Sequence, residues 1–427
     1  MTWHLGLAPL LALLLAACGG GSKDDWPVAA DLQRDIEATD LRIDIASRTA
    51  SAQIQFGASA TPGASLEVGD LRIDAVSVDG RPIDFRRSGK LLDLAVGSAA
   101  TTVRIDYAWQ VHPDAGGVAL GSTLTWPQAC GNMFPCHSSP SDGSRFTLTL
   151  SGVPAGQVAV YAASIPEAAP AYQLAWSIGT YQRTALGRTA AGTDIVRWNH
   201  AEEEDAAAQG SAYLVAGFDW LERSLGPYRF GREAGPVSAH WAGDGWAGME
   251  THPLWHVNTS ALADERVQLH EAAHGWFGNG VRLACWEDMV LSEGAATYYE
   301  ARLLEEVAGA ARGQAVWRLL DAELAGLRER GGGGVARPAG CNQTPPQTVF
   351  SRAIYVKGAH YLRALERRLT RPAFDASMRT LYSRFGGRAA GISDLVAVIL
   401  EQTGHDATAC TRDWLQSTTI PTDSTCL

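Results

Sequence analysis

Hydrophobic and polar residues alternate along the first half of the chain, from about Asp40 to Trp198. The clearest runs are residues 41–45 (LRIDI), 52–56 (AQIQF), 103–107 (VRIDY) and 146–150 (FTLTL). A period of two places successive side chains on opposite faces of a strand, so each run predicts a strand with one buried face. Turn signals such as Asp79-Gly80 separate the runs. The pattern therefore predicts an N-terminal antiparallel β-sandwich.

After an acidic cluster at residues 202–205, the hydrophobic period changes to that of helices. The first helical segment covers residues 212–225 and ends at Gly226-Pro227. A glycine run at residues 331–334, followed by a loop reaching Tyr355, interrupts the later helices. We therefore predict an α+β multidomain fold. Its predicted domains are a β-sandwich over residues 27–203 and a mainly helical domain over residues 204–427.

The N-terminus has the features of a processing signal rather than of a folded segment. Residues 5–17 form an apolar run that is too short to span a bilayer. The sequence Leu15-Ala16-Ala17-Cys18 resembles a bacterial lipobox. We expect residues 1–17 to be a lipoprotein signal peptide, Cys18 to be lipidated, and residues 18–26 to be a tether. No Lys or Arg precedes the apolar run, which leaves a weak signal or a misassigned start codon as alternatives.

A lipidated Cys18 would anchor the protein to a membrane of the bacterial cell envelope, at the outer membrane or facing the periplasm. The length of 427 residues allows two or three domains with sizeable cores. The net charge of -11 and the absence of a basic run argue against nucleic acid as a partner.

Six cysteines remain in the chain after Cys18. An even number of cysteines in an exported chain indicates disulfides, although six cysteines allow fifteen pairings and the sequence alone does not choose among them. We predict that sequence neighbours pair. The predicted pairs are Cys130 with Cys136, Cys285 with Cys341, and Cys410 with Cys426.

The segment HEAAH, His270 to His274, suggests the most specific chemistry in the chain. Residues four apart lie on one face of a helix, so His270 and His274 can bind a single metal ion. Glu271 lies beside that face, where a carboxylate can take a proton from water. This layout is typical of a metallohydrolase, but HEAAH alone fits a solvated surface helix as well.

Glu293 is the third candidate ligand. Eighteen residues separate it from His274, and Gly278-Asn279-Gly280 is a stop signal for the first helix. A second helical pattern begins near Asp288, which places Glu293 near its start. Two antiparallel helices can then present His, His and Glu to one zinc ion and leave a fourth position open.

Four ordered blocks resemble motifs of the gluzincin zinc aminopeptidases, the family of the alanyl aminopeptidases. The blocks are AGMET (247–251), HEAAHGWFGNGV (270–281), WEDMVLSEG (286–294) and YVKGA (355–359). They are similar to the family's GAMEN, HExAHxWFGNxV, WxDxxLxEG and YxKGA motifs, in that order. Four matching blocks are specific where any one is weak. The resemblance covers nearly all of the mature chain and implies that the helical domain is a thermolysin-like zinc catalytic domain.

The resemblance implies a role for each matching residue. His270, His274 and Glu293 match the ligands of one Zn²⁺ per chain. Glu271 matches the general base, and Tyr355 matches the tyrosine that hydrogen-bonds the oxyanion, where a neutral phenol donor stabilises developing charge. By residue type and position alone, a packed tyrosine fits Tyr355 equally well.

The resemblance also implies a substrate-binding segment. Glu250, with Gly248 and Met249, matches the segment that binds the substrate, and Glu250 matches the glutamate that holds the free α-ammonium group. A carboxylate at a fixed distance from the zinc restricts cleavage to the first residue of a peptide. Without the resemblance, Glu250 fits a solvated loop carboxylate as well. Thr251 stands where the family usually has Asn.

Two further departures from the family pattern concern the substrate cleft. Phe134-Pro135-Cys136 is similar to the FPC that opens a family loop, but residues 137–139 follow in place of an acidic sequence. Larger members of the family carry an additional β module and a helical domain that roofs the active site. The resemblance stops short of both, so we expect an open cleft that admits longer peptides.

The leading hypothesis is a zinc aminopeptidase that acts on peptides with a free N-terminus. An endopeptidase or other amide hydrolase with the same zinc centre is the second hypothesis. The third is a non-catalytic peptide-binding lipoprotein, for which the complete set of site residues is hard to explain. The side-chain preference, the native substrate and the oligomeric state do not follow from the sequence.

Overall fold

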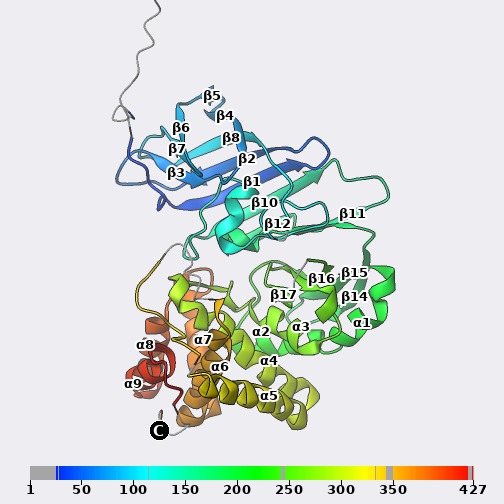
Figure 1. Ribbon diagram of the computed structural model, residues 1–427, viewed down its shortest axis with the longest axis vertical. Coiled ribbons are helices and arrows are strands. Elements are labelled where there is room, and N and C mark those ends of the chain that lie inside the picture. The colour runs from blue at the N-terminus through cyan, green and yellow to red at the C-terminus, as the bar shows by residue number, and fades with distance from the viewer. Residues whose placement is uncertain are drawn as a thin grey trace, which may run out of the picture.

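In the computed structural model, a β-rich N-terminal region lies above a largely helical C-terminal region in the view of Figure 1. The structure describes residues 26, 28–113, 115–241, 246–331, 333–342, 350–421 and 426. The predicted signal peptide, Cys18 and most of the predicted tether lie outside the described residues. Among the helices of the described ranges, none combines the length and the hydrophobicity that crossing a membrane requires.

The largest sheet of the N-terminal region has the strand order β12-β10-β1-β2-β8-β4-β5. Its strands are β1 (Ile36–Asp44), β2 (Thr49–Phe56), β4 (Arg72–Val78), β5 (Arg81–Pro82), β8 (Thr101–Ala108), β10 (Ser144–Ser151) and β12 (Ser164–Ala169). In β1, Leu41 and Ile43 are buried whereas Arg42 between them is exposed. All four predicted alternating runs lie in this sheet, in β1, β2, β8 and β10.

One strand pair of this sheet departs from the antiparallel prediction. Strands β1 and β10 run parallel, with Leu41 opposite Leu148. A parallel pair needs a long connection that returns the chain to the same end of the sheet, and residues 45–143 supply it here. Alternation within a strand reports its buried face and not the direction of its neighbour, so the sequence pattern does not reveal this pairing.

Two smaller sheets complete the N-terminal region. They have the orders β3-β7-β6 and β11-β13-β9. Their strands are β3 (Ala64–Glu67), β6 (Phe85–Ser88), β7 (Leu91–Leu94), β9 (Ser122–Thr123), β11 (Val158–Tyr161) and β13 (Trp176–Gly179). Leu66, Leu92 and Trp176 of these sheets belong to the same buried hydrophobic cluster as the large sheet. The N-terminal β domain of the predicted α+β fold is confirmed.

A five-stranded sheet links the two regions, in the order β14-β15-β16-β18-β17. Its strands are β14 (Gln182–Arg188), β15 (Asp194–Asn199), β16 (Glu233–Ala239), β17 (Gly248–Met249) and β18 (Leu254–Asn258). Because β15 pairs with β16, the hydrogen bonds of this sheet extend across the predicted boundary at residues 203/204. The edge strand β17 ends immediately before Glu250, which places the substrate-binding segment of the family at the edge of a rigid sheet.

The C-terminal region is built mainly from helices, which Figure 1 shows below the sheets. They are α1 (Glu204–Gly210), α2 (Leu214–Leu225), α3 (Glu265–Ala273), α4 (Glu293–Ala308), α5 (Ala310–Glu329), α6 (Arg352–Leu369), α7 (Arg371–Phe385), α8 (Ile392–Thr403) and α9 (Thr408–Thr411). A small sheet combines β19 (Phe277–Gly278) and β20 (Val281–Leu283), which follow α3, with β21 (Ala389–Ala390), which follows α7. The predicted helix 212–225 corresponds to α2, and Gly226, at φ 136°, follows its last residue.

Helices α4 and α6 approach each other closely at Gly294 and Gly358. A Cβ atom on Gly294 would lie 2.8 Å from the Cα of Gly358, and a Cβ on Gly358 would lie 2.7 Å from the Cα of Gly294. Only glycine fits at such a contact. The crossing brings the start of α6, which carries Tyr355, close to the start of α4, which carries Glu293.

The three predicted disulfides are confirmed. Cys130 pairs with Cys136, Cys285 with Cys341, and Cys410 with Cys426. The second bond ties the chain just before Trp286 to a segment 56 residues further on. It therefore links the WEDMVLSEG block to the segment that follows α5.

Candidate metal centre and active site

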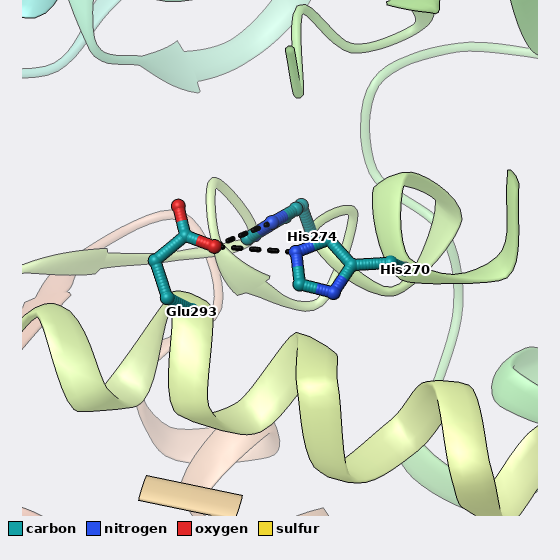
Figure 2. A group of neighbouring side chains, drawn as sticks. All are labelled: His270, His274 and Glu293. Carbon is teal, nitrogen blue, oxygen red and sulfur yellow. Dashed lines mark hydrogen bonds and ion pairs between the residues drawn. The ribbon is translucent and has the colours of Figure 1, made fainter. Parts of the chain in front are cut away.

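Two histidines and one glutamate converge at the junction of α3 and α4. His270 lies on α3, His274 follows its last residue, and Glu293 begins α4. Nε2 of His270 lies 3.2 Å from Oε2 of Glu293, and Nε2 of His274 lies 3.6 Å from the same oxygen (Figure 2). The candidate ligand atoms of the three residues all lie within 4.8 Å of one another. The two predicted helices thus bring the predicted ligand set together.

The second ring nitrogen of each histidine is held away from this centre. Nδ1 of His274 lies 3.1 Å from the main-chain oxygen of Phe277. A carbonyl oxygen only accepts, so Nδ1 of His274 donates to it, and Nε2 on the opposite side of the ring faces Glu293. Nδ1 of His270 lies 3.2 Å from Oε2 of Glu300. Contacts of this kind fix the orientation of metal-binding imidazoles.

The three side chains shift one another's pKa values. Burial acts to lower the pKa values of His270 and His274, but nearby carboxylates, Glu293 among them, raise both overall. Burial acts to raise the pKa of Glu293, and the two histidines lower it well below its usual value. Two imidazole nitrogens and one carboxylate oxygen are a donor set that catalytic zinc uses, with one position left open. The residues present therefore fit a zinc ion.

Glu271 lies buried beside this centre. Its Oε2 atom has no hydrogen-bond partner among the described residues. Burial raises the pKa of the Glu271 carboxyl above its usual value. Strand β17 passes so close to this carboxylate that a Cβ atom at Gly248 would overlap it. A buried carboxylate with a raised pKa and a free oxygen is well suited to accept and return a proton.

Glu250 occupies the other side of Glu271. Carboxylate oxygens of Glu250 and Glu271 and a ring nitrogen of His274 lie within 4.8 Å of one another. The side-chain amide of Asn279, in the turn between β19 and β20, donates to the main-chain oxygen of Glu250. The Tyr172 hydroxyl, from the N-terminal region, donates to Oδ1 of Asn279 at 3.4 Å. The position of Glu250 therefore depends on residues from both regions of the chain.

The segment after Glu250 is held by buried polar contacts. The Thr251 hydroxyl lies 2.7 Å from Nδ1 of His256 and 3.0 Å from the main-chain oxygen of Leu254. Nε2 of His252 lies 2.8 Å from the main-chain oxygen of Glu271. Burial lowers the pKa values of His252 and His256 to about 3, so both rings are neutral. Both histidines are thus packed in the interior and hold the segment that follows Glu250.

Tyr355 lies in the first turn of α6. The sequence predicts a loop that reaches this residue, and that prediction is wrong, because the helix begins at Arg352. The Tyr355 ring is nearly parallel to that of His270, with 6.2 Å between the ring centroids. Burial, together with the nearby Glu293 and Glu250, raises the pKa of Tyr355 well above its usual value. The phenol therefore stays protonated and can donate a hydrogen bond.

A single cavity of about 380 Å³ is lined by all of the predicted metal, catalytic and substrate-binding residues. They are Gly248, Met249, Glu250, His270, Glu271, His274, Glu293 and Tyr355. Segments that are distant in the sequence thus meet at one site. The predicted lipidation site, Cys18, lies outside the described residues.

The cavity is also lined by residues that the sequence analysis does not identify. They are Trp126, Tyr172, Trp246, Arg266, Glu300, Phe350 and Arg352. Glu300 lies seven positions after Glu293, which places both side chains on the same face of the helix. This spacing in the sequence could therefore have identified Glu300 as a residue near the site. The others come from separate segments and have no signal in the sequence that connects them to the site. Thr297 also lines the cavity, and its buried hydroxyl has no partner among the described residues.

The part of the chain that carries this site is similar to known peptidases. Residues 251–414 match the peptidase family M1 domain. The chain is 29% identical over 276 residues to leucine aminopeptidase 2 of Eremothecium gossypii, a match that covers 60% of this chain and 43% of that protein. It is 28% identical over 145 residues to aminopeptidase N of Caulobacter vibrioides, covering 33% of this chain and 16% of the relative. The chain thus spans less than half the length of these curated relatives.

Solved structures share the fold over most of the chain. The M1 zinc metallopeptidase of Deinococcus radiodurans superimposes with a TM-score of 0.77 at 22% identity, covering 91% of this chain and 95% of that one. The LTA4 hydrolase of yeast superimposes with a TM-score of 0.74 at 17% identity, covering 91% of this chain and 68% of that one. The domain match, the related sequences and the ordered motifs show that residues 251–414 form a domain of peptidase family M1, the family of the gluzincin zinc aminopeptidases.

Proposed function

We propose that the protein is a zinc aminopeptidase that removes the N-terminal residue of peptides. The observation that carries this proposal is the meeting of His270, His274 and Glu293 with two further buried carboxylates in one cavity. The two possible metal-binding groups share His274, which supports one zinc ion per chain. Peptides are the proposed substrates, because a variant of the Deinococcus radiodurans M1 metallopeptidase has been solved with a Tyr-Ser-Ala substrate.

In the proposed mechanism, zinc held by His270, His274 and Glu293 supplies Lewis-acid chemistry when bound. Oε2 of Glu271 accepts a proton from the attacking water and then delivers it to the departing nitrogen. The Tyr355 hydroxyl donates a hydrogen bond to the carbonyl oxygen as that oxygen gains negative charge. Such a donor favours the transition state over the ground state, because its partner is charged only there.

Glu250 is proposed to bind the free α-ammonium group of the substrate. It is a buried carboxylate close to Glu271, and burial raises its pKa. An ammonium group would supply the opposite charge that favours the ionised form of such a carboxylate. Because β17 and Asn279 hold Glu250 at one place beside the cavity, the proposal restricts cleavage to the first peptide bond.

Aminoacyl reporter substrates and their N-acetylated counterparts test this function. We expect the wild-type protein to cleave only the free-amine substrates and to lose activity with a chelator. Glu271→Ala should reduce kcat by about 100-fold or more, because the proton carrier is lost. Glu265→Gln, on the same helix but facing Arg312 rather than the cavity, should retain activity. Persistent activity of Glu271→Ala would refute the mechanism, and equal cleavage of acetylated substrates would favour an endopeptidase.

We also propose that Cys18 is lipidated and anchors the protein in the bacterial cell envelope. The support is the lipobox-like sequence Leu15-Ala16-Ala17-Cys18 and the glycine-rich segment after it. When the full chain is expressed in a bacterium, the protein should fractionate with membranes and carry acyl groups detectable by mass spectrometry. Cys18→Ala should release it from the membrane fraction. Membrane association that survives this substitution would contradict lipid anchoring at Cys18.

A further inference from the structure

A smaller cavity of about 150 Å³ adjoins the active-site cavity. Trp126, Trp246, Gly248 and Met249 line both, so the two spaces share a wall next to Glu250. The shared wall is aromatic, because the rings of Trp126 and Trp246 meet edge to face with their centroids 4.3 Å apart. The smaller cavity therefore lies next to the proposed position of the substrate's first residue.

The lining of the smaller cavity is mainly apolar. Ala115, Leu124 and Trp241 complete it, and no residue in its described lining carries a charge. Leu124 and Trp126 follow β9 of the N-terminal region, whereas Trp241 and Trp246 lie in the segment between β16 and β17. Both regions of the fold thus build this space.

The charged side chains lie elsewhere in the site. Arg266, Glu300 and Arg352 line the main cavity but not the smaller one. An ionic side chain of a substrate would lose its hydration in the smaller cavity and find no opposite charge among the described residues that line it. An apolar side chain would instead gain from contact with the indole rings.

The size of the cavity limits which apolar group fits. An apolar cavity of this volume can hold one benzene ring. A methyl side chain would leave most of the volume empty and would gain little from burial. A phenyl or isobutyl group would fill much more of it.

On these grounds we propose that the cavity of Trp126, Trp241, Trp246, Leu124 and Met249 receives the side chain of the N-terminal residue. This cavity makes the protein selective for peptides that begin with Phe or a large aliphatic residue. This inference rests on the proposed aminopeptidase function, because Glu250 must hold the α-ammonium group for the first side chain to enter this space.

The wild-type protein should cleave Phe and Leu reporter amides with kcat/KM at least about tenfold above that for Ala and Arg amides. Leu124→Trp fills the cavity and should lower the ratio of Phe to Ala cleavage by at least about tenfold. Leu120→Trp is the matched control, because Leu120 is exposed and does not line the cavity. It should change this ratio less than twofold.

Inhibition by free amino acids gives a second readout of the same selectivity. Free L-phenylalanine should inhibit wild type more strongly than L-alanine does, and Leu124→Trp should remove that difference. If Leu124→Trp does not fold, Trp241→Ala takes its place, and opening the cavity wall should also lower the ratio of Phe to Ala cleavage.

Two results would overturn the inference while leaving the proposed function intact. One is chelator-sensitive cleavage of the four free-amine substrates at similar rates, or fastest cleavage of the Ala or Arg amide. The other is an equal loss of Phe and Ala cleavage in Leu124→Trp. Failure to cleave any free-amine substrate would refute the proposed aminopeptidase function, and the selectivity would fall with it.

Discussion

At the scale of single residues, Glu300 shows how a side chain can serve the metal centre without binding the metal. Its carboxylate lies 3.2 Å from Nδ1 of His270, whose Nε2 faces Glu293. A carboxylate in this position fixes the ring orientation and makes the imidazole a more basic ligand. Glu300 is buried on the same face of α4 as Glu293, so the helix presents both groups to α3.

We expect Glu300→Ala to lower zinc affinity by about 10- to 100-fold, because His270 loses the group that orients it. Competition with a chromogenic chelator measures this affinity directly, without reference to catalysis. Glu329→Ala, at the exposed end of α5, is the control and should bind zinc as the wild type does. Equal zinc affinity in Glu300→Ala and wild type would contradict a positioning role for Glu300.

At the scale of elements, the unit formed by β17, β18 and the turn between them carries Glu250. A buried histidine joins this unit to β13 of the N-terminal region, because Nε2 of His256 lies 3.0 Å from the Ser177 hydroxyl. Nδ1 of the same ring contacts Thr251 at 2.7 Å. The segment that carries Glu250 is therefore held through a buried, neutral imidazole.

This burial makes the unit sensitive to acid. The pKa of His256 falls from 6.5 to about 3 on folding, because burial disfavours the charged ring. Between these values the unfolded chain binds a proton that the folded protein does not. The contribution of the neutral ring to the free energy of unfolding is complete above pH 6.5. As the pH falls below this value, that contribution decreases by up to about 1.4 kcal/mol per pH unit.

Between pH 7 and pH 5 we therefore expect the free energy of unfolding to fall by about 2 kcal/mol more in the wild type than in His256→Gln. Urea unfolding of both proteins at pH 7, 6 and 5 measures this shift. The comparison cancels the contributions of other titrating groups, such as the buried carboxylates. Parallel pH profiles for the two proteins would show that His256 is not buried in neutral form.

At the scale of the whole molecule, Arg282 connects the two regions. Its guanidinium donates to the main-chain oxygens of Ala168 at 2.8 Å, Gly387 at 3.0 Å and Ser141 at 3.4 Å. Ala168 belongs to the N-terminal sheet, whereas Gly387 precedes β21 of the C-terminal region. Burial lowers the pKa of Arg282, although nearby carboxylates, including Asp142, act to raise it.

We expect Arg282→Met to lower the free energy of unfolding by about 2–4 kcal/mol, because three carbonyl oxygens lose a charged donor. Denaturant unfolding measures the loss, and limited proteolysis should show faster cleavage between the two regions. Arg145→Met, at an exposed position of β10, should change neither result. A stability equal to that of the wild type would contradict a linking role for Arg282.

Much of the fold and of the site follows from the sequence alone. Alternation predicts β1, β2, β8 and β10, and helical periodicity predicts α2, because both report which face of an element is buried. The spacing of His270 and His274 predicts that the two rings share a helix face. The pairing of sequence neighbours among the six cysteines was one of fifteen possibilities, and the structure bears it out. These properties depend on residues that are near one another in the chain.

Other features exist only in the folded molecule. The parallel pairing of β1 with β10, the support of Asn279 by Tyr172 and the shared aromatic wall of Trp126 and Trp246 all join distant segments. No period or short motif encodes such contacts, because they arise when sheets and helices pack and bury their apolar faces together. The sequence by itself therefore determined which groups could bind a metal ion and carry a proton, whereas the tertiary structure decided which side chains surround them.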